Sequence, residues 1–154
     1  MTTDNILIKG IIHVTGEHDA GKTTFALECG AQPDRICFFD DDVKGRSTVE
    51  QIKSAGVKFG AYHDLVALAS GKTELDFYAS CMDIVEKIKP GQYDAIVWDT
   101  WTNFQNVIHP YVLAHRSQFR ATWSPMGQIK GAQEWQESHK HEAAILNQLQ
   151  NSLS

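Results

Sequence analysis

Short apolar runs alternate with helical patterns along the first hundred residues. The runs with the length and the β-branched or aromatic composition of strands lie at residues 11–14, 35–39, 57–62 and 93–100. Helices are expected between them, at residues 24–29, 47–55 and 73–89. Strands that alternate with helices favour a parallel sheet joined by right-handed crossovers. The pattern therefore predicts an α/β fold with three α/β/α layers.

The segment from Thr73 has the clearest helical pattern. Thr73 and Asp76 form a variant of the capping box, and Pro90 ends the segment. Its apolar residues recur at helical spacing and predict one face packed on the sheet, formed by Tyr78, Cys81, Met82, Val85 and Ile88. The next run, residues 93–100, is apolar as far as Asp99, which is typical of a strand buried on both faces.

The pattern changes after residue 100. Residues 101–131 contain Pro110 and Pro125 and are predicted to be irregular. Residues 132–149 are predicted to form a polar helix, with its candidate anchors at Trp135, Ile145 and Leu149. Because no strand follows this helix, we expect a single domain over residues 1–154 that lacks the last strands of its core.

Composition limits the expected number of domains, the binding partners and the cellular compartment. A chain of 154 residues, 42% hydrophobic and with a formal charge of −5, is expected to be one domain without bulk affinity for nucleic acid or anionic membrane. The three cysteines have no metal-ligand spacing and are expected to be buried, reduced thiols, which favours a cytoplasmic location. Neither a signal peptide nor a membrane-spanning run is predicted.

The most specific motif lies between the first predicted strand and the first predicted helix. It has the spacing G-x-x-x-x-G-K-T and consists of Gly16, Glu17, His18, Asp19, Ala20, Gly21, Lys22 and Thr23, followed by Thr24. Its two glycines let a tight loop direct backbone N–H groups at a triphosphate. Lys22 would reach the β- and γ-phosphates, and the Thr23 hydroxyl would complete a Mg²⁺ shell. A chance match in a glycine-rich turn is the alternative.

Asp99 ends the 93–100 run, at the edge of a parallel sheet where ligands bind. It fits the Walker B aspartate that holds the Mg²⁺ water shell opposite Thr23. An aspartate that merely caps a turn at the strand end is the alternative. Thr100 stands where many ATPases have a glutamate, so an acid that orients water must come from elsewhere.

Three consecutive aspartates follow the 35–39 run. Carboxylates packed near a bound triphosphate are costly unless a cation offsets them, which favours a functional role. We predict two catalytic residues, Lys22 and Asp42, with Asp42 as the catalytic acid. Asp40 and Asp41 are the second choices for the acid. A solvated turn that ends the strand is the alternative, and Lys44 close by would neutralise it.

The G-K-T loop, the F-F-D-D-D strand end and the late I-V-W-D-T strand together resemble the RecA-type P-loop ATPase core. The nearest resemblance is to small phage RecA-like proteins, the single-strand-annealing and recombination ATPases often described as phage AAA-domain nucleotide-binding proteins. The resemblance implies ATP and Mg²⁺ as cofactors, hydrolysis, a homo-oligomer and the host-cell cytoplasm. It also places Asp42 where RecA has its catalytic glutamate, with a side chain shorter by one methylene.

In RecA-like proteins, a loop after the Walker B strand contacts single-stranded DNA. The resemblance therefore implies DNA contacts from this part of the chain, and the candidates are Arg116, Arg120, Trp123 and Lys130. Cations interleaved with aromatic rings can follow a backbone and stack on bases. The alternative is that Trp123 is a core residue and that the others lie on an ordinary surface.

Three functional hypotheses follow from these motifs. The first is a Mg²⁺-dependent RecA-like ATPase that acts on single-stranded DNA in recombination or annealing. The second is a small-molecule or nucleotide kinase, in which the aspartates orient an acceptor hydroxyl. The third is a nucleotide-binding regulatory or structural module without turnover.

Overall fold

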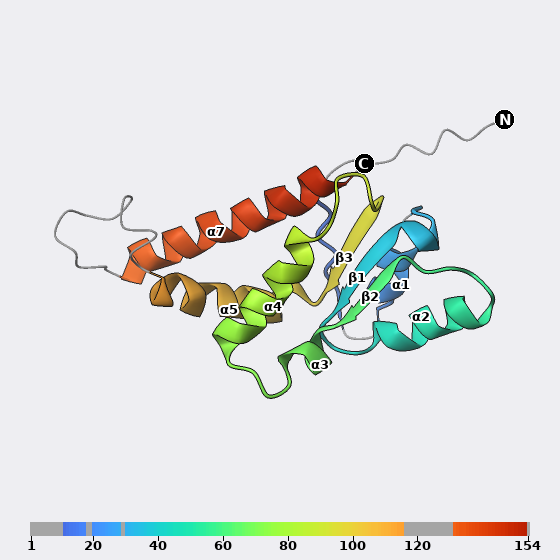
Figure 1. Cartoon of the computed structure of the whole chain (residues 1–154), viewed down its shortest axis with the longest axis horizontal. Coiled ribbons are helices and arrows are strands. Elements are labelled where there is room, and N and C mark those ends of the chain that lie inside the picture. Colours follow the sequence, from blue (N-terminus) through green and yellow to red (C-terminus); the bar gives the residue numbers. More distant parts are fainter. Residues whose placement is uncertain (1–10, 18–19, 29, 116–130, 154) are drawn as a thin grey trace.

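The computed structural model describes residues 11–17, 20–28, 30–115 and 131–153 (Figure 1). The elements in chain order are α1 (Lys22–Leu27), a short 3-10 helix (Pro33–Arg35), β1 (Ile36–Asp40), α2 (Gly45–Ser54), β2 (Ala61–Asp64), α3 (Leu65–Ala69), α4 (Glu74–Glu86), β3 (Ala95–Asp99), α5 (Trp101–Ala114) and α7 (Gly131–Ser152).

The three strands form one parallel sheet in the order β2-β1-β3. Asp40, the last residue of β1, is in register with Asp64 of β2 and with Asp99 of β3. Each strand therefore ends in an aspartate at the same edge of the sheet. The parallel sheet, with helices between its strands, confirms the predicted α/β fold class.

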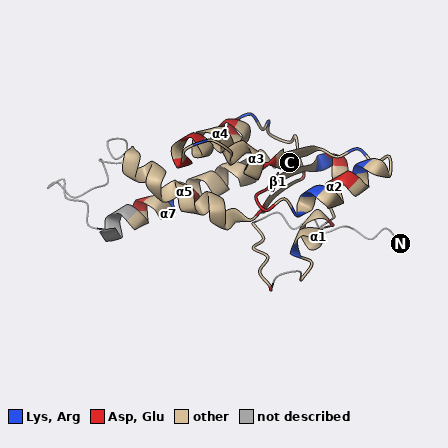
Figure 2. Ribbon diagram, turned by 90° about the horizontal axis from the view of Figure 1, so that it is seen from below, with Lys and Arg blue, Asp and Glu red and all other residues tan. Residues whose placement is uncertain are grey.

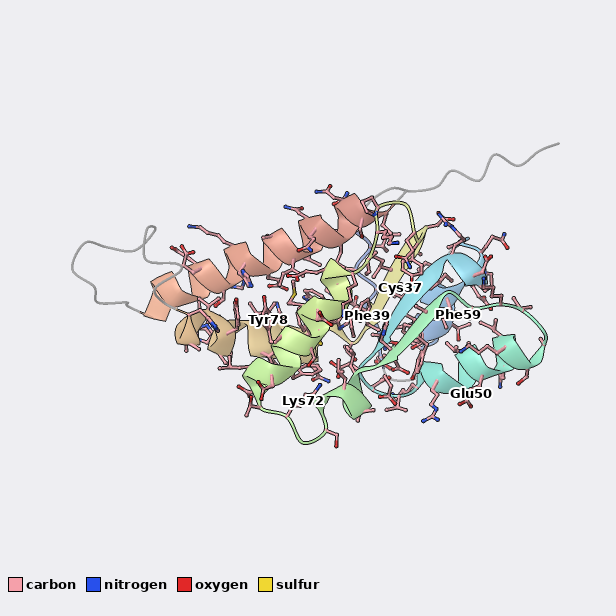
Figure 3. The ribbon with its side chains drawn as sticks, viewed as in Figure 1. Cys37, Phe39, Glu50, Phe59, Lys72 and Tyr78 are labelled. Carbon is pink, nitrogen blue, oxygen red and sulfur yellow. The ribbon has the colours of Figure 1, made fainter. Side chains whose placement is uncertain are left out.

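The central strand, β1, is buried along its whole length and separates two cores. Cys37 and Phe39 belong to the larger core, which α4, α5 and α7 complete. Ile36 and Phe38 belong to the smaller core, together with Leu27 of α1 and other side chains. Figure 3 labels Phe39 and Tyr78 of the larger core and Phe59 of the smaller one. Alternation along a single strand thus places helices on both faces of the sheet.

Helix α4 matches its prediction closely. The Thr73 hydroxyl accepts a hydrogen bond from the Asp76 backbone N–H at 3.2 Å, as a capping box requires. Tyr78, Cys81 and Val85 are buried in the larger core, and the other two residues of the predicted face, Met82 and Ile88, pack against it. Cys37 and Cys81 are free, buried thiols, as predicted, whereas Cys29 lies outside the described residues.

The strand predicted at residues 11–14 is absent. These residues have no regular structure, and Ile11 and Ile12 are 56% and 57% exposed. Beside the outer edge of β3, the only backbone bridge among the described residues joins Tyr93 to Leu153 in parallel. A β-branched run needs a neighbouring strand to become a strand itself, and this run has none within the described chain.

The irregular segment predicted at residues 101–131 is wrong for its first half. Residues 101–114 form α5, which continues through Pro110. Four apolar side chains at helical spacing are buried beneath it: Phe104, Val107, Ile108 and Val112. Their burial offsets the backbone hydrogen bond that a proline removes. Residues 116–130, in the second half, lie outside the described residues.

Other predictions needed smaller corrections. Helix α2 begins at Gly45 rather than at residue 47. β2 begins at Ala61 rather than residue 57. β3 is not buried on both faces: among the described strands it pairs with β1 alone, and of its five residues only Val97 is buried. Ile145 and Leu149 anchor α7 as predicted, but Trp135 is 53% exposed.

Candidate functional site

The glycine loop, residues 16–21, precedes α1 and is held mainly by one side chain. Lys22 Nζ donates hydrogen bonds to the carbonyl oxygens of Gly16 at 2.9 Å and Glu17 at 2.7 Å. Gly21, at the end of the loop, has φ 81°, a left-handed conformation that favours glycine. The described residues of this loop are exposed. The ammonium group therefore closes the loop on itself.

Thr23, the first hydroxyl after the lysine, is in direct contact with the sheet. Its Oγ1 donates a short hydrogen bond to Asp99 Oδ2, across 76 positions of the sequence. Both side chains are half-buried. The structure thus brings together the two residues that the sequence assigned to one Mg²⁺ ion. A hydroxyl and a carboxylate are hard oxygen ligands of the kind that Mg²⁺ prefers, so this pair fits that ion.

Asp40, Asp41, Asp42 and Asp99 form what we call the acidic edge of the sheet. Figure 2 shows acidic residues at the end of β1, whereas α5 carries no charged residue. The aspartates differ in burial: Asp40 is fully buried, Asp41 is 9% exposed, and the Asp42 side chain is 32% exposed. The three adjacent aspartates, Asp40, Asp41 and Asp42, therefore lie in three different chemical environments.

Asp40 is anchored by hydrogen bonds to both carboxylate oxygens. Tyr62 of β2 donates its hydroxyl to Oδ2 at 2.7 Å, and the Asp42 backbone N–H donates to Oδ1 at 3.3 Å. Burial raises the pKa of Asp40, and the Tyr62 hydrogen bond opposes that shift. Burial and the hydrogen bond to Asp40 both raise the pKa of Tyr62. Sequence reasoning missed Tyr62, because no local signal pairs it with an aspartate of another strand.

The Asp41 side chain is buried close to two other carboxylates. Its pKa is raised to about 6: burial is the main cause, a hydrogen bond with Asn103 opposes the shift, and the charges of Asp40 and Asp42 add to it. Its Oδ2 is buried and has no hydrogen-bond partner among the described residues. Its backbone N–H donates to the Asp99 carbonyl at 2.6 Å, which ties the ends of β1 and β3 together. Asp41 therefore holds its proton more tightly in the folded state than an ordinary aspartate does.

Asp42 lies in a tight turn before α2. Its Oδ1 accepts the Lys44 backbone N–H at 3.1 Å, and its Oδ2 lies 3.8 Å from Lys44 Nζ. Between them, Val43 has φ 66°, a conformation that β-branched residues rarely adopt. Lys44 thus pairs with Asp42, and the catalytic role of Asp42 stays a prediction.

The remaining predicted site residues lie outside the described residues. These are His18 and Asp19 of the glycine loop and the four proposed DNA contacts, Arg116, Arg120, Trp123 and Lys130. Of the loop residues that are described, Glu17, Ala20 and Thr24 are exposed.

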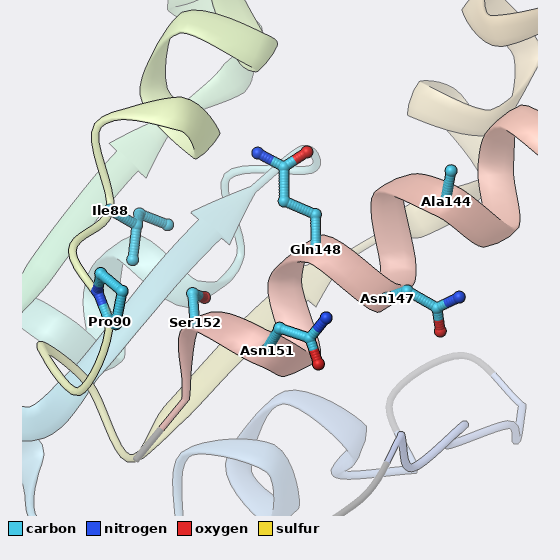
Figure 4. A pocket seen from close by; sticks show the side chains of 7 residues that line it. All are labelled: Ile88, Pro90, Ala144, Asn147, Gln148, Asn151 and Ser152. Atoms are coloured by element: carbon cyan, nitrogen blue, oxygen red, sulfur yellow. The ribbon is translucent and has the colours of Figure 1, made fainter.

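Two surface pockets lie elsewhere. One, of about 560 Å³, lies between the end of α4 and α7 and is lined mainly by neutral side chains such as Asn147, Gln148 and Asn151 (Figure 4). The other, of about 290 Å³, lies between α2 and β2 and includes Tyr62 and Arg46. Neither is lined by Lys22, Thr23 or Asp99. In the described part of the chain, no helix is long and apolar enough to cross a membrane.

Comparison with known proteins adds one finding. No curated protein and no solved structure matches the chain. The family model described as an AAA domain matches residues 9–153. This range includes the glycine loop, Lys22, Thr23 and the whole acidic edge. AAA domains are nucleotide-binding P-loop NTPases and are typically ATPases. With this match over nearly its whole length and a G-K-T loop set against a strand-end aspartate, the chain belongs to the AAA domain family.

Proposed function

We propose that this protein is a RecA-like, Mg²⁺-dependent ATPase of phage type that acts on single-stranded DNA in recombination or annealing. The observation that carries the proposal is the hydrogen bond between Thr23 and Asp99. It joins the end of the G-K-T motif to the end of β3 at the edge of the sheet where ligands of parallel sheets bind. The AAA domain match supports nucleotide binding independently of this geometry.

Each residue of the site has a proposed role. The glycine loop would surround the phosphates with backbone N–H groups, and Lys22 would exchange the carbonyls of Gly16 and Glu17 for phosphate oxygens. Thr23 and Asp99 would hold Mg²⁺, which neutralises charge on the phosphates when bound. Asp42 would orient the attacking water once its carboxylate leaves Lys44.

We propose that the active form is a homo-oligomer. A cation that stabilises the developing charge of phosphoryl transfer is a common requirement of P-loop ATPases. The two arginines within the described residues are both paired with carboxylates, Arg35 with Asp94 and Arg46 with Glu50. A neighbouring subunit is therefore the proposed source of this cation.

Phosphate release, measured with and without single-stranded DNA, tests the proposal. Wild-type protein with ATP and Mg²⁺ should release phosphate, and single-stranded DNA should accelerate the release. Asp42→Ala should bind ATP normally and lose turnover, because it keeps the loop and the Thr23–Asp99 pair. Full turnover in Asp42→Ala would remove Asp42 from the role of catalytic acid.

A second candidate, a nucleotide-binding module without turnover, is favoured by the Asp42 environment. Asp42 is engaged by Lys44, and Thr100 follows Asp99 where a glutamate would serve hydrolysis. Tight ATP binding without phosphate release at any DNA concentration would support this candidate. Transfer of phosphate to a metabolite in the same assay would instead support the kinase hypothesis.

A further inference from the structure

The turn after β1 is braced from the neighbouring strand. Tyr62 in β2 donates its hydroxyl to Asp40 Oδ2 at 2.7 Å, and Asp40 Oδ1 accepts the Asp42 backbone N–H at 3.3 Å. One fully buried carboxylate therefore links β2 to the backbone of the turn. In the register of the sheet, Tyr62 of β2 lies opposite Phe38 of β1, two residues before Asp40. The tyrosine hydroxyl therefore reaches Asp40 from the adjacent strand.

The first residue of α2 allows this arrangement. An added Cβ on Gly45 would lie 2.0 and 2.3 Å from ring atoms of Phe38, and 3.3 Å from Asp40 Oδ2. Helix α2 can therefore begin directly over Phe38 and Asp40 only with glycine at this position. The start of α2 thus packs against Asp40 at Gly45, while Tyr62 donates a hydrogen bond to the same carboxylate from β2.

The braced turn is itself strained. Val43 adopts φ 66°, which costs a β-branched residue more than it would cost glycine or asparagine. Such a conformation persists only where surrounding contacts fix it. The hydrogen bonds at Asp40 and the Lys44 N–H bond to Asp42 lie on the two sides of Val43 and supply those contacts.

We propose that Tyr62 is a positioning residue for Asp42, acting through the Asp40 carboxylate. This inference rests on the proposed ATPase function, in which Asp42 orients water. Without the Tyr62 hydroxyl, Asp40 loses the partner that fixes its Oδ2, and the turn that carries Asp42 loses one of its supports. Nucleotide contacts made by the glycine loop, Lys22, Thr23 and Asp99 do not involve Tyr62, so turnover and nucleotide affinity should separate.

The test compares Tyr62→Phe with a matched loss of one hydroxyl. Tyr93→Phe is the control, because the Tyr93 hydroxyl also makes one hydrogen bond, which it accepts from Gln92 at 3.1 Å, but Tyr93 precedes β3, on the other side of β1 from β2. In Tyr62→Phe, kcat should fall between about tenfold and hundredfold, as small misplacements of catalytic groups do, while KM and the Kd for ATP stay within twofold. Tyr93→Phe should match the wild type in all three constants.

A double variant separates positioning from a general loss of structure. Tyr62→Phe combined with Asp40→Asn should lower kcat no further than the more impaired of the two single variants, since both act through one link. Unchanged kcat in Tyr62→Phe, or fully multiplicative losses in the double variant, would overturn the inference while the wild-type turnover still supported the ATPase. Wild-type protein that binds ATP and releases no phosphate would overturn the ATPase function and, with it, the role of Tyr62.

Discussion

The two halves of the proposed nucleotide site differ in how firmly they are held. The acidic edge rests on β1, which is buried throughout, and its members are tied to Tyr62, to Asn103 and to the backbone of β3. The described residues of the glycine loop are exposed, and Lys22 holds the loop through two carbonyl oxygens. In the proposed function, the acidic edge is thus arranged before ATP binds, whereas the glycine loop would exchange its internal contacts for contacts with ATP.

This difference predicts which property of the protein each substitution should change. Changes in the acidic edge should alter the stability of the fold, because they disturb a buried, closely packed region. Changes in the glycine loop should alter ligand binding with little effect on the fold, because few contacts of the folded protein depend on it.

The largest effect is expected at Lys22. Lys22→Ala should abolish detectable ATP binding, with a Kd at least about a hundredfold higher, because it removes the cation that meets the phosphates. Its melting temperature should stay close to that of the wild type, since among the described residues the Lys22 ammonium group donates its hydrogen bonds to loop carbonyls. Calorimetric titration with ATP measures the first effect. Lys87→Ala is the control, because Lys87 lies on α4 and pairs only with Asp83 at the surface. Unchanged affinity in Lys22→Ala would contradict a phosphate-binding loop.

The next largest effect is expected at Gly45. Gly45→Ala should lower the free energy of unfolding by about 1–3 kcal/mol, since its methyl group would collide with the buried Phe38 ring. Chemical denaturation with urea measures the change. A stability equal to that of the wild type would mean that α2 shifts freely, and that the acidic edge is less rigid than the structure indicates.

A smaller, pH-dependent effect is expected at Asp41. Burial raises its pKa from 3.8 to about 6, so the folded state holds the proton more tightly than the unfolded state does. The stability that Asp41 contributes is therefore complete below about pH 4 and is lost as the pH rises through about 6. Asp41→Asn should remove this loss, so that its stability relative to the wild type improves by about 2 kcal/mol between pH 4 and pH 7. Parallel stability curves for the two proteins, measured without nucleotide, would contradict this assignment.

The smallest effect on stability is expected in the glycine loop. A Cβ on Gly16 would meet the Ala20 Cβ at 3.5 Å, which is ordinary van der Waals contact. Gly16→Ala should therefore change the free energy of unfolding by less than about 0.5 kcal/mol. Measured beside Gly45→Ala in the same denaturation series, it sharpens the contrast between the two halves. A loss as large as that of Gly45→Ala would show that the loop supports the fold.

The sequence predicted the elements whose signals are local. The Thr73 capping box and the apolar face of α4 depend on residues close together in the sequence. The β1 run is apolar enough to predict a buried strand without knowledge of its neighbours. Thr23 and Asp99, which the sequence assigns to one ion, lie in contact because strand ends and loop motifs of parallel sheets meet at one edge.

The failures arose where tertiary contacts decide. Helix α5 was predicted as irregular because of Pro110, although Phe104, Val107, Ile108 and Val112 already had helical spacing in the sequence. Residues 11–14 looked like a strand, but strand formation depends on a neighbour that the sequence pattern does not specify. The Tyr62–Asp40 contact joins two strands and has no local signal.

Thr23 and Asp99 are the proposed Mg²⁺ ligands of the nucleotide site. Calorimetric titration of the wild type and of Asp99→Asn with ATP, each with Mg²⁺ and with a chelator, tests this role most directly. We predict that Mg²⁺ strengthens ATP binding to the wild type by about tenfold or more, and that this gain disappears in Asp99→Asn because the neutral amide is a poorer ligand for a hard cation. An equal gain from Mg²⁺ in the two proteins would contradict this role.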